Sequence, residues 1–261
     1  ERFGTADHAD DGNLYKCVYN PLGICLLKWR GPTKADYFVT QGCSEGYETC
    51  GLELQTNEDD PAQNDYSDLI HFLDVLEHTP DGQFEAAIAK VLDVDQFLRL
   101  TAVSFAISSL DSYFGKGNNY YLYHRVADHR FIMLPWDFNG AYMGGSCTKL
   151  YDPTCNSGGA TGDHPLAERI MAVPAFRAQY RKHIEEITAK WMTVDQHVTW
   201  IKELDALVGP LVDDDPNYIG EPGDYAKATA LDAPMDAWTE NLVAFVAKRH
   251  EDLVAALAAE P

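Results

Sequence analysis

No stretch of the sequence is apolar enough to cross a membrane, and positive charge is scarce. The apolar runs fall well short of the ~20 residues that a bilayer-spanning helix needs, so we expect no membrane span. Asp and Glu outnumber Lys and Arg by 41 to 20, which gives a formal net charge of −21. Nucleic-acid binding relies on cationic side chains that neutralise phosphates, so the composition argues against a nucleic-acid partner. A nucleotide would also be repelled unless Mg²⁺ or Ca²⁺ were first recruited onto carboxylates.

The spacings typical of zinc, calcium and serine hydrolase sites are also missing. The sequence has no Cys-x-x-Cys pair and no His-Glu-x-x-His among its nine histidines. The acidic segment 7–13 begins like a calcium loop, but its twelfth position is Val18 rather than Glu, so we expect a polar turn. Neither Ser112 nor Ser146 has a nearby His–Asp pattern. These spacings therefore favour neither a zinc site, a calcium loop nor serine hydrolase chemistry.

The six cysteines fall into three close pairs, and each pair brackets turn-forming residues. The pairs are Cys17 and Cys25, Cys43 and Cys50, and Cys147 and Cys155. Short loops of this kind favour local disulfides, although six cysteines allow 15 connectivities, and buried free thiols or a metal remain alternatives. Disulfides would place the protein in an oxidising compartment, so we expect a secreted, extracellular or cell-surface location. The chain begins at Glu1, so we also expect that a signal peptide or a larger upstream piece precedes it.

Hydrophobic periodicity predicts an α+β fold within a single domain, residues 1–261. Residues 1–64 are rich in strand and loop signals, and runs at 14–19 and 25–27 predict a short hairpin around a Pro-Leu-Gly turn. Residues 65–261 are mainly helical. Helical stripes occur at 69–76, at 84–91, at 94–110, at 174–191 and at 238–257.

Three further details of this helical part matter below. Asp65 or Ser67 is a candidate N-cap for the first helix. The segment 94–110 is apolar nearly all round, which predicts a central buried helix. The acidic stretch 212–234 reads as a loop.

Polar residues gather around a predicted β-hairpin at residues 118–139. Asp111 follows the central helix, Asn118 and Asn119 precede the first strand, and Asp137 follows the second. Because a hairpin returns its two ends to the same place, we expect these side chains to converge. Carboxylate and amide oxygens suit a hard divalent cation. The alternative reading is local: Asp111 would cap a helix end, and Asp137 would satisfy turn N–H groups.

At these residues the sequence resembles the CotH kinase family. The resemblance rests on an ordered series of segments that covers nearly the whole chain: 11–16 (Asp-Gly-Asn-Leu-Tyr-Lys), 65–70, 91–98, 118–123, 135–139 (Pro-Trp-Asp-Phe-Asn), 164–166 and 249–253. It implies an atypical protein kinase-like fold. It also implies a protein kinase that uses ATP and a metal ion to phosphorylate Ser on secreted, surface or coat proteins.

The resemblance also assigns roles to single residues. Asp111 matches the catalytic-loop carboxylate that accepts or orients the substrate hydroxyl, and Asn118 or Asn119 matches the amide downstream of it. Asp137 matches the Asp that binds Mg²⁺ or Mn²⁺ beside ATP. Asn139 replaces a second acidic position of that motif, and we include it with Asn119 and Asp137 as a predicted metal ligand.

One departure from the family pattern bears on catalysis. Similar proteins carry an upstream, strand-rich stretch that covers the nucleotide, whereas only residues 1–8 precede the matching segments here. We therefore expect the upper lobe to be missing or truncated, or the chain to be a fragment. Lys16 and Lys28 are left out of the predicted site as ordinary surface lysines. The alternative function is a surface or structural protein that keeps the fold with weak or no catalysis.

Overall fold

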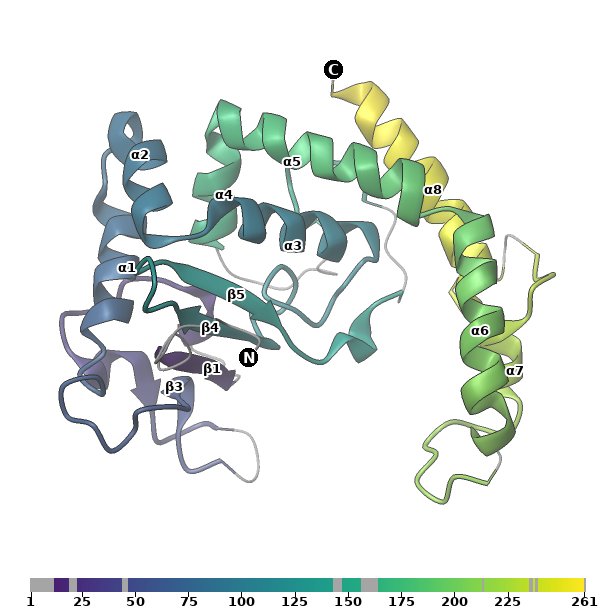
Figure 1. Ribbon diagram of the computed structural model, residues 1–261, viewed down its shortest axis with the longest axis horizontal. Coiled ribbons are helices and arrows are strands. Elements are labelled where there is room, and N and C mark those ends of the chain that lie inside the picture. The colour runs from purple at the N-terminus through teal and green to yellow at the C-terminus, as the bar shows by residue number, and fades with distance from the viewer. Residues whose placement is uncertain are drawn as a thin grey trace.

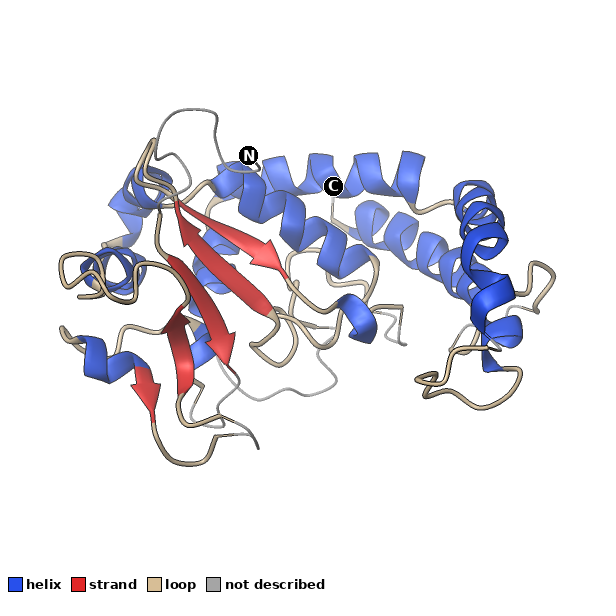
Figure 2. Ribbon diagram, turned by 60° about the horizontal axis from the view of Figure 1, so that its bottom comes forward, coloured by secondary structure: helices blue, strands red, loops and turns tan. Residues whose placement is uncertain are grey.

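The structure combines one antiparallel sheet with a larger set of helices. It is a computed structural model that describes residues 12–18, 23–43, 47–142, 147–155, 164–212, 214–234, 237 and 239–260. The sheet lies toward one end of the molecule together with the two helices at residues 67–91, and the later helices extend from there toward the opposite end (Figures 1 and 2). The predicted α+β class is therefore confirmed.

The sheet has five antiparallel strands in the order β2-β3-β1-β4-β5. The strands are β1 (Leu14–Val18), β2 (Phe38–Val39), β3 (Cys50–Leu54), β4 (Tyr120–His124) and β5 (Phe131–Pro135). Alternation decides which side chains enter the core, because successive residues of a strand point to opposite faces. Tyr15 and Leu122 are fully buried, whereas their neighbours Lys16 and Tyr121 are only partly buried. Since Lys16 and Tyr121 are partners in the β1–β4 register, they stand side by side on the face away from the core.

The helices carry most of the remaining core. They are α1 (Ser67–His78), α2 (Asp81–Val91), α3 (Val94–Ala106), α4 (Pro165–Ala172), α5 (Pro174–Glu186), α6 (Val194–Val212), α7 (Asp224–Thr229) and α8 (Leu242–Ala259), with short helices η1 (Ile24–Leu26), η2 (Lys34–Tyr37), η3 (Phe138–Gly140) and the π-helix η4 (Ile187–Trp191). Helix α3 packs between β5 and α5, and buries Phe97, Leu98 and Phe105. In both ribbon views α6 and α7 lie at the end farthest from the sheet (Figures 1 and 2).

Several predicted elements are confirmed with shifted ends. The hairpin at 118–139 is formed by β4 and β5, in a register that pairs Tyr120 with Pro135. Helix α1 begins at Ser67, so Ser67 is not its N-cap; Tyr66 occupies that position, while Asp65 accepts a hydrogen bond from the Ser67 backbone N–H at 2.8 Å. The stripe at 84–91 falls within α2.

Three predictions of local structure are wrong. Residues 25–27 do not form a second hairpin strand, because the chain turns into η1 and β1 pairs with β3 and β4 instead. The central helix ends at Ala106 rather than near 110, since Ser108 adopts a left-handed φ of 49°. Asp111 therefore lies in a series of turns and not at a helix end. The stretch 212–234 is not all loop, because it contains α7.

The cysteine pairs are bridged as their spacing suggested. The structure joins Cys17 to Cys25, Cys43 to Cys50 and Cys147 to Cys155. None of the helices in the described ranges has the length and hydropathy required to cross a bilayer. Most of the acidic segment 7–13, the expected turn at 20–22, Ser146 and Trp238 lie outside the described residues.

Candidate functional site

Asp111 is the centre of a small polar cluster. Its Oδ1 accepts a hydrogen bond from the Asn118 side-chain amide at 2.9 Å, and its Oδ2 accepts one from the Asn119 amide at 3.0 Å. The Lys116 ammonium lies 3.3 Å from Oδ1. Three donors from one short segment therefore fix the position and rotation of the Asp111 carboxylate. These contacts involve side chains, so the alternative role of Asp111 as a helix cap is not what the structure shows.

The backbone around Asp111 is held by turns rather than by regular structure. Gly117 and Asn118 both donate backbone hydrogen bonds to the carbonyl of Ser112, at 3.0 and 3.4 Å. Gly117 adopts a φ of +72°, which is readily available only to glycine, and a Cβ there would lie 2.5 Å from the Leu26 side chain. The sequence at 112–118 thus closes a tight loop that presents both asparagines to Asp111.

The hairpin brings Asp137 back to the same region. Strand β5 ends at Pro135, opposite Tyr120, and the next residue, Trp136, donates its backbone N–H to the carbonyl of Asn119 at 3.1 Å. Asp137 follows directly, with a left-handed φ of 50° that turns the chain into η3. Both ends of the hairpin therefore lie beside Asn119, as the sequence predicted.

Helix η3 also packs against Asp111. The Leu110 N–H donates to the carbonyl of Gly140 at 3.1 Å. A Cβ placed on Gly140 would come within 2.7 Å of the Asp111 Cβ. Real carbon atoms do not approach so closely, so position 140 requires glycine if Asp111 is to keep its place. The segments that carry Asp111 and Asp137 are thereby joined by direct packing.

Asn118, Asn119 and Asp137 line one cleft of about 210 Å³. Its other walls come from β1, β4 and the aromatic residues around them: Lys16, Cys17, Val18, Tyr47, Tyr120, Tyr121 and Trp136. Asp111 is not among the lining residues, but it lies directly behind the two asparagines. Asn139 is exposed on η3 and does not line the cleft either. Sharing of one cation by these residues stays a prediction.

The side chains of the cleft suit a Mg²⁺ ion that is held partly by waters and phosphates better than a metal ion that is held by protein ligands alone. Among the described residues, no group of three or more His, Cys, Asp or Glu side chains is arranged to hold a metal. Mg²⁺, however, is usually bound through one or two carboxylates together with waters and substrate phosphates. Asp137 and the amide of Asn119 match that pattern. The buried Oδ1 of Asn118 also has no hydrogen-bond partner within the protein, which leaves a free oxygen beside Asp111.

Five residues that the sequence interpretation left out of the predicted site belong to this region: Lys16, Tyr47, Lys116, Tyr121 and Trp136. Lys16 lines the cleft, and its ammonium stands 5.5 Å from the centre of the Tyr47 ring. Trp136 is 55% exposed and meets Tyr121 edge to face, with ring centroids 5.5 Å apart. Lys116 contacts Asp111. The strand alternation of 14–18 was the signal that could have placed Lys16 on the cleft side, opposite the buried Tyr15.

A second polar cluster joins the family segments 11–16 and 65–70. The Asp68 carboxylate accepts hydrogen bonds from Tyr15 at 2.5 Å and from Asn13 at 3.0 Å, and it lies 3.1 Å from Nδ1 of His124. Burial would raise the pKa of Asp68, but the contacts with His124 and Tyr15 outweigh burial and lower this pKa. Burial, together with the neighbouring carboxylate, raises the pKa of Tyr15 far above its usual value. The cluster fastens β1, and with it Lys16, to the first turn of α1.

Arg249 in α8 supports the loop region from the other side. It is almost completely buried, and its guanidinium donates to the carbonyls of Phe105 at 2.6 Å, Ala106 at 3.2 Å and Cys147 at 2.7 Å. It also lies over the Phe105 ring, 4.6 Å from the centroid. A cation at the C-terminal end of α3 satisfies the last carbonyls of that helix and complements its dipole. The family segment 249–253 thus has a structural role behind the site.

Comparison with known proteins relates the chain to a protein family and to a curated protein. The profile of the family described as CotH kinase protein matches residues 3–253. The chain is also 25% identical, over 173 residues, to the inner spore coat protein H of Bacillus subtilis (strain 168). That alignment covers 63% of this chain and 44% of the relative, so the chain spans less than half of the relative's length.

Proposed function

Because the chain belongs to the CotH kinase protein family, we propose that it is a metal-dependent protein kinase that transfers phosphate from ATP to Ser of extracellular or coat proteins. One observation carries the proposal: Asp111 is fixed by Asn118 and Asn119, and the hairpin returns Asp137 to the same asparagines. Catalytic Asp, downstream Asn and a second Asp after a hairpin are the parts that a protein kinase needs, in the order in which it needs them.

Asp111 is the residue that handles the substrate hydroxyl. Its carboxylate is oriented by three donors, which leaves the remaining lone pairs to accept the hydroxyl proton. In the transfer the Ser oxygen bonds to the γ-phosphorus, the bond from that phosphorus to the bridging oxygen breaks, and ADP leaves. The proton passes to Asp111 and then to solvent. Lys116 is close enough to Asp111 to balance its charge throughout.

Asp137 and Asn119 are the groups that would hold Mg²⁺ or Mn²⁺, with Asn139 in support. The bound ion would neutralise phosphate charge, which a protein of net charge −21 otherwise repels. Lys16 adds a positive charge on the cleft wall and suits a phosphate oxygen. The exposed faces of Tyr47 and Trp136 offer flat surfaces on which a nucleobase can stack.

Three disulfides and the likeness to a spore coat protein support the proposed location outside the cytoplasm. The alternative function is a coat or surface protein that keeps this fold without effective catalysis. It is favoured by Asn139, which supplies an amide where an acidic group is common in the family motif. It is also favoured by the satisfied state of Asp111, whose three protein donors hold it without any ligand.

The two functions are separated by Asp137→Asn and Asp111→Asn, made in the full-length protein. Phosphate transfer from labelled ATP to casein, and to the protein itself, is measured with Mg²⁺ and with Mn²⁺. Asp59→Asn on an exposed loop is the matched control, because it removes the same charge from a side chain that does not line the cleft. For a kinase, each site variant should lose at least ~100-fold in transfer rate, as when a group that stabilises the transition state is removed.

Thermal melts provide the second readout. Metal and ATP at about 100 times their dissociation constant should stabilise the wild type by about 2.7 kcal/mol, and Asp137→Asn should lose that gain while melting normally in chelator. Equal transfer by wild type and both variants, or equal responses to metal, would exclude the kinase site. An inactive wild type that also ignores metal and ATP would support the structural alternative.

A further inference from the structure

The turn that follows the hairpin begins and ends with an unusual backbone conformation. Asp137 and Tyr142 adopt left-handed φ angles of 50° and 59°, which residues other than glycine rarely take. Ser108 and Asn119, in the neighbouring segments, have φ angles of 49° and 52°. These four are half of the eight such residues in the described part of the chain. Conformations of this kind persist only where the surrounding structure over-determines them, so we expect outside contacts to hold the turn at 137–142.

The far end of this turn is fastened at Tyr142. Its backbone N–H donates to the carbonyl of Ile107, the C-cap of α3, at 2.8 Å. Its ring meets Phe245 of α8 and His197 of α6 edge to face, with ring centroids 5.3 and 5.9 Å apart. Tyr142 therefore joins the turn to the end of α3, to α8 and to α6.

The Tyr142 hydroxyl makes a hydrogen bond whose direction follows from the partners of His197. The hydroxyl oxygen lies 3.2 Å from Nε2 of His197, and Nδ1 of the same ring lies 3.1 Å from the carbonyl of Thr193. A carbonyl can only accept, so Nδ1 carries the ring proton and Nε2 accepts the hydrogen bond from Tyr142. Burial lowers the pKa of His197, against the effect of the Thr193 carbonyl, and the ring is therefore neutral at pH 7. Burial raises the pKa of Tyr142, so its hydroxyl keeps the proton that it donates.

We propose that His197 is a positioning residue for Asp137 and that it acts through Tyr142. The hydrogen bond from the hydroxyl holds Tyr142 in place, Tyr142 holds the end of the turn, and the turn places Asp137 at the cleft. This role rests on the proposed function, in which Asp137 binds Mg²⁺ or Mn²⁺. It gives a part in the site to α6, although α6 extends to the end of the molecule farthest from the sheet (Figure 1).

The free energy of one neutral hydrogen bond limits the size of the expected effect. Such a bond changes an equilibrium by about fivefold. Without it the turn leaves the required position in a fraction of the molecules, and the apparent affinity for ATP with metal falls by that fraction. Saturating ATP and metal stabilise the required position again, so the maximal rate recovers. We therefore expect a raised KM for ATP together with a nearly unchanged kcat.

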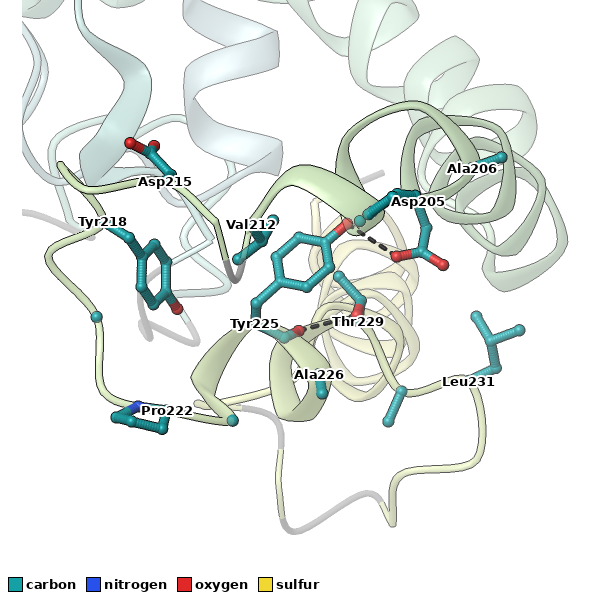
Figure 3. Close-up of a pocket in the computed structure, with 15 residues that line it drawn as sticks. Asp205, Ala206, Val212, Asp215, Tyr218, Pro222, Tyr225, Ala226, Thr229 and Leu231 are labelled. Atoms are coloured by element: carbon teal, nitrogen blue, oxygen red, sulfur yellow. Dashed lines mark hydrogen bonds between the residues drawn. The ribbon is translucent and has the colours of Figure 1, made fainter.

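Four variants of the full-length protein test this role. Tyr142→Phe removes the donor, and His197→Leu removes the acceptor. His197→Gln carries a side-chain oxygen that can accept in place of Nε2, so it should behave as the wild type does. Tyr225→Phe is the matched control, because the Tyr225 hydroxyl donates at 2.9 Å to Asp205, farther along the same helix. Both of these residues line a separate hollow of about 890 Å³ between α6 and α7 (Figure 3).

The first measurement is phosphate transfer to casein at varied ATP with excess Mn²⁺. Tyr142→Phe and His197→Leu should each raise the KM for ATP about two- to fivefold and leave kcat within about twofold of wild type. His197→Gln and Tyr225→Phe should keep the wild-type KM. The combined variant of Tyr142→Phe and His197→Leu should be no worse than the stronger single variant, because both changes remove the same contact.

Hydrogen exchange followed by mass spectrometry reports on the turn itself and needs neither metal nor ATP. The peptide that covers residues 136–142 should exchange about two- to fivefold faster in Tyr142→Phe and in His197→Leu. In His197→Gln and Tyr225→Phe it should exchange at the wild-type rate.

The outcomes separate this role from the proposed function. Wild-type exchange in both Tyr142→Phe and His197→Leu would overturn the role of His197. An active wild type whose KM for ATP is shared by these two variants would overturn it as well, and so would a loss confined to kcat. A wild type that neither transfers phosphate nor responds to metal would refute the proposed function instead, and the exchange rates would still decide whether His197 holds the turn.

Discussion

Replacing Arg249 by Met should destabilise the protein although it removes a buried charge. Burial lowers the pKa of Arg249 to about 10, with Asp252 acting in the opposite direction, and a drop of that size corresponds to a cost of about 3 kcal/mol. Against it stand three charge-assisted hydrogen bonds to carbonyls, each contributing about 1.5–3 kcal/mol. Ser108 still donates to the Phe105 carbonyl at 3.3 Å in the variant, whereas the hydrogen bonds from Arg249 to the Ala106 and Cys147 carbonyls are lost. We expect a net loss of about 2–4 kcal/mol.

The assay is unfolding by urea and by heat under non-reducing conditions, followed by circular dichroism. For a chain of this size the loss corresponds to a decrease in melting temperature of roughly 5–15 °C. Lys182→Met on the exposed side of α5 makes the same chemical change and should stay within about 0.5 kcal/mol of wild type. Arg249→Lys should be intermediate, because one ammonium cannot span three carbonyls. A variant Arg249→Met that melts at or above the wild-type temperature would show that desolvation exceeds the hydrogen bonds, and would refute this account of how α8 supports the loop.

Three further predictions test other parts of the fold. Asp68→Asn should lower the free energy of unfolding, measured by urea titration, by about 2–4 kcal/mol at pH 7. Because the pKa of Asp68 is lowered in the folded state, this difference from the wild type should shrink as pH falls below about 4. The exposed control Asp74→Asn should show neither effect. Burial raises the pKa of Tyr66 to about 12, so the stability that the neutral hydroxyl contributes is complete below pH 10 and is lost between pH 10 and 12. Over that range the free energy of unfolding of Tyr66→Phe should therefore fall by about 2 kcal/mol less than that of the wild type. Cys43→Ser with Cys50→Ser should cost about 2–3 kcal/mol in thermal melts, the value expected for a bridge that closes a short loop, and an unchanged melting temperature would contradict the chain-entropy account.

The parts of the fold that the sequence predicted correctly are those governed by local rules. Alternation and a short polar turn were enough for β4 and β5, and turn-forming brackets were enough for the three disulfides. The convergence of Asn119 and Asp137 followed from hairpin geometry alone. Such features depend on residues close in sequence, so a single chain without relatives contains the information.

The errors arose where tertiary contacts override local preference. Ile107 and Leu110 extend the apolar pattern of the helix, yet α3 ends at Ala106, where the Arg249 guanidinium donates hydrogen bonds to the carbonyls of Phe105 and Ala106. Helix α6 was not predicted as a separate element: Leu204, Leu207, Val208 and Leu211 have the spacing of one helix face, but Pro210 lies within the segment, and proline disfavours a helix interior. Lys16 was set aside as an ordinary surface lysine, since its neighbours in the cleft come from β4 and from Trp136, more than 100 positions along the chain.

The contact between Gly140 and Asp111 sets a rule for anyone who redesigns this site. The position admits a hydrogen and nothing larger, so the spacing between the segment that carries Asp111 and the turn after Asp137 is a fixed dimension of the scaffold. A library that varies residue 140 would mostly report on damage to that spacing and not on substrate preference. Changes in specificity are better sought on the cleft walls formed by Tyr47, Tyr121 and Trp136, because none of these side chains packs against Asp111 as residue 140 does.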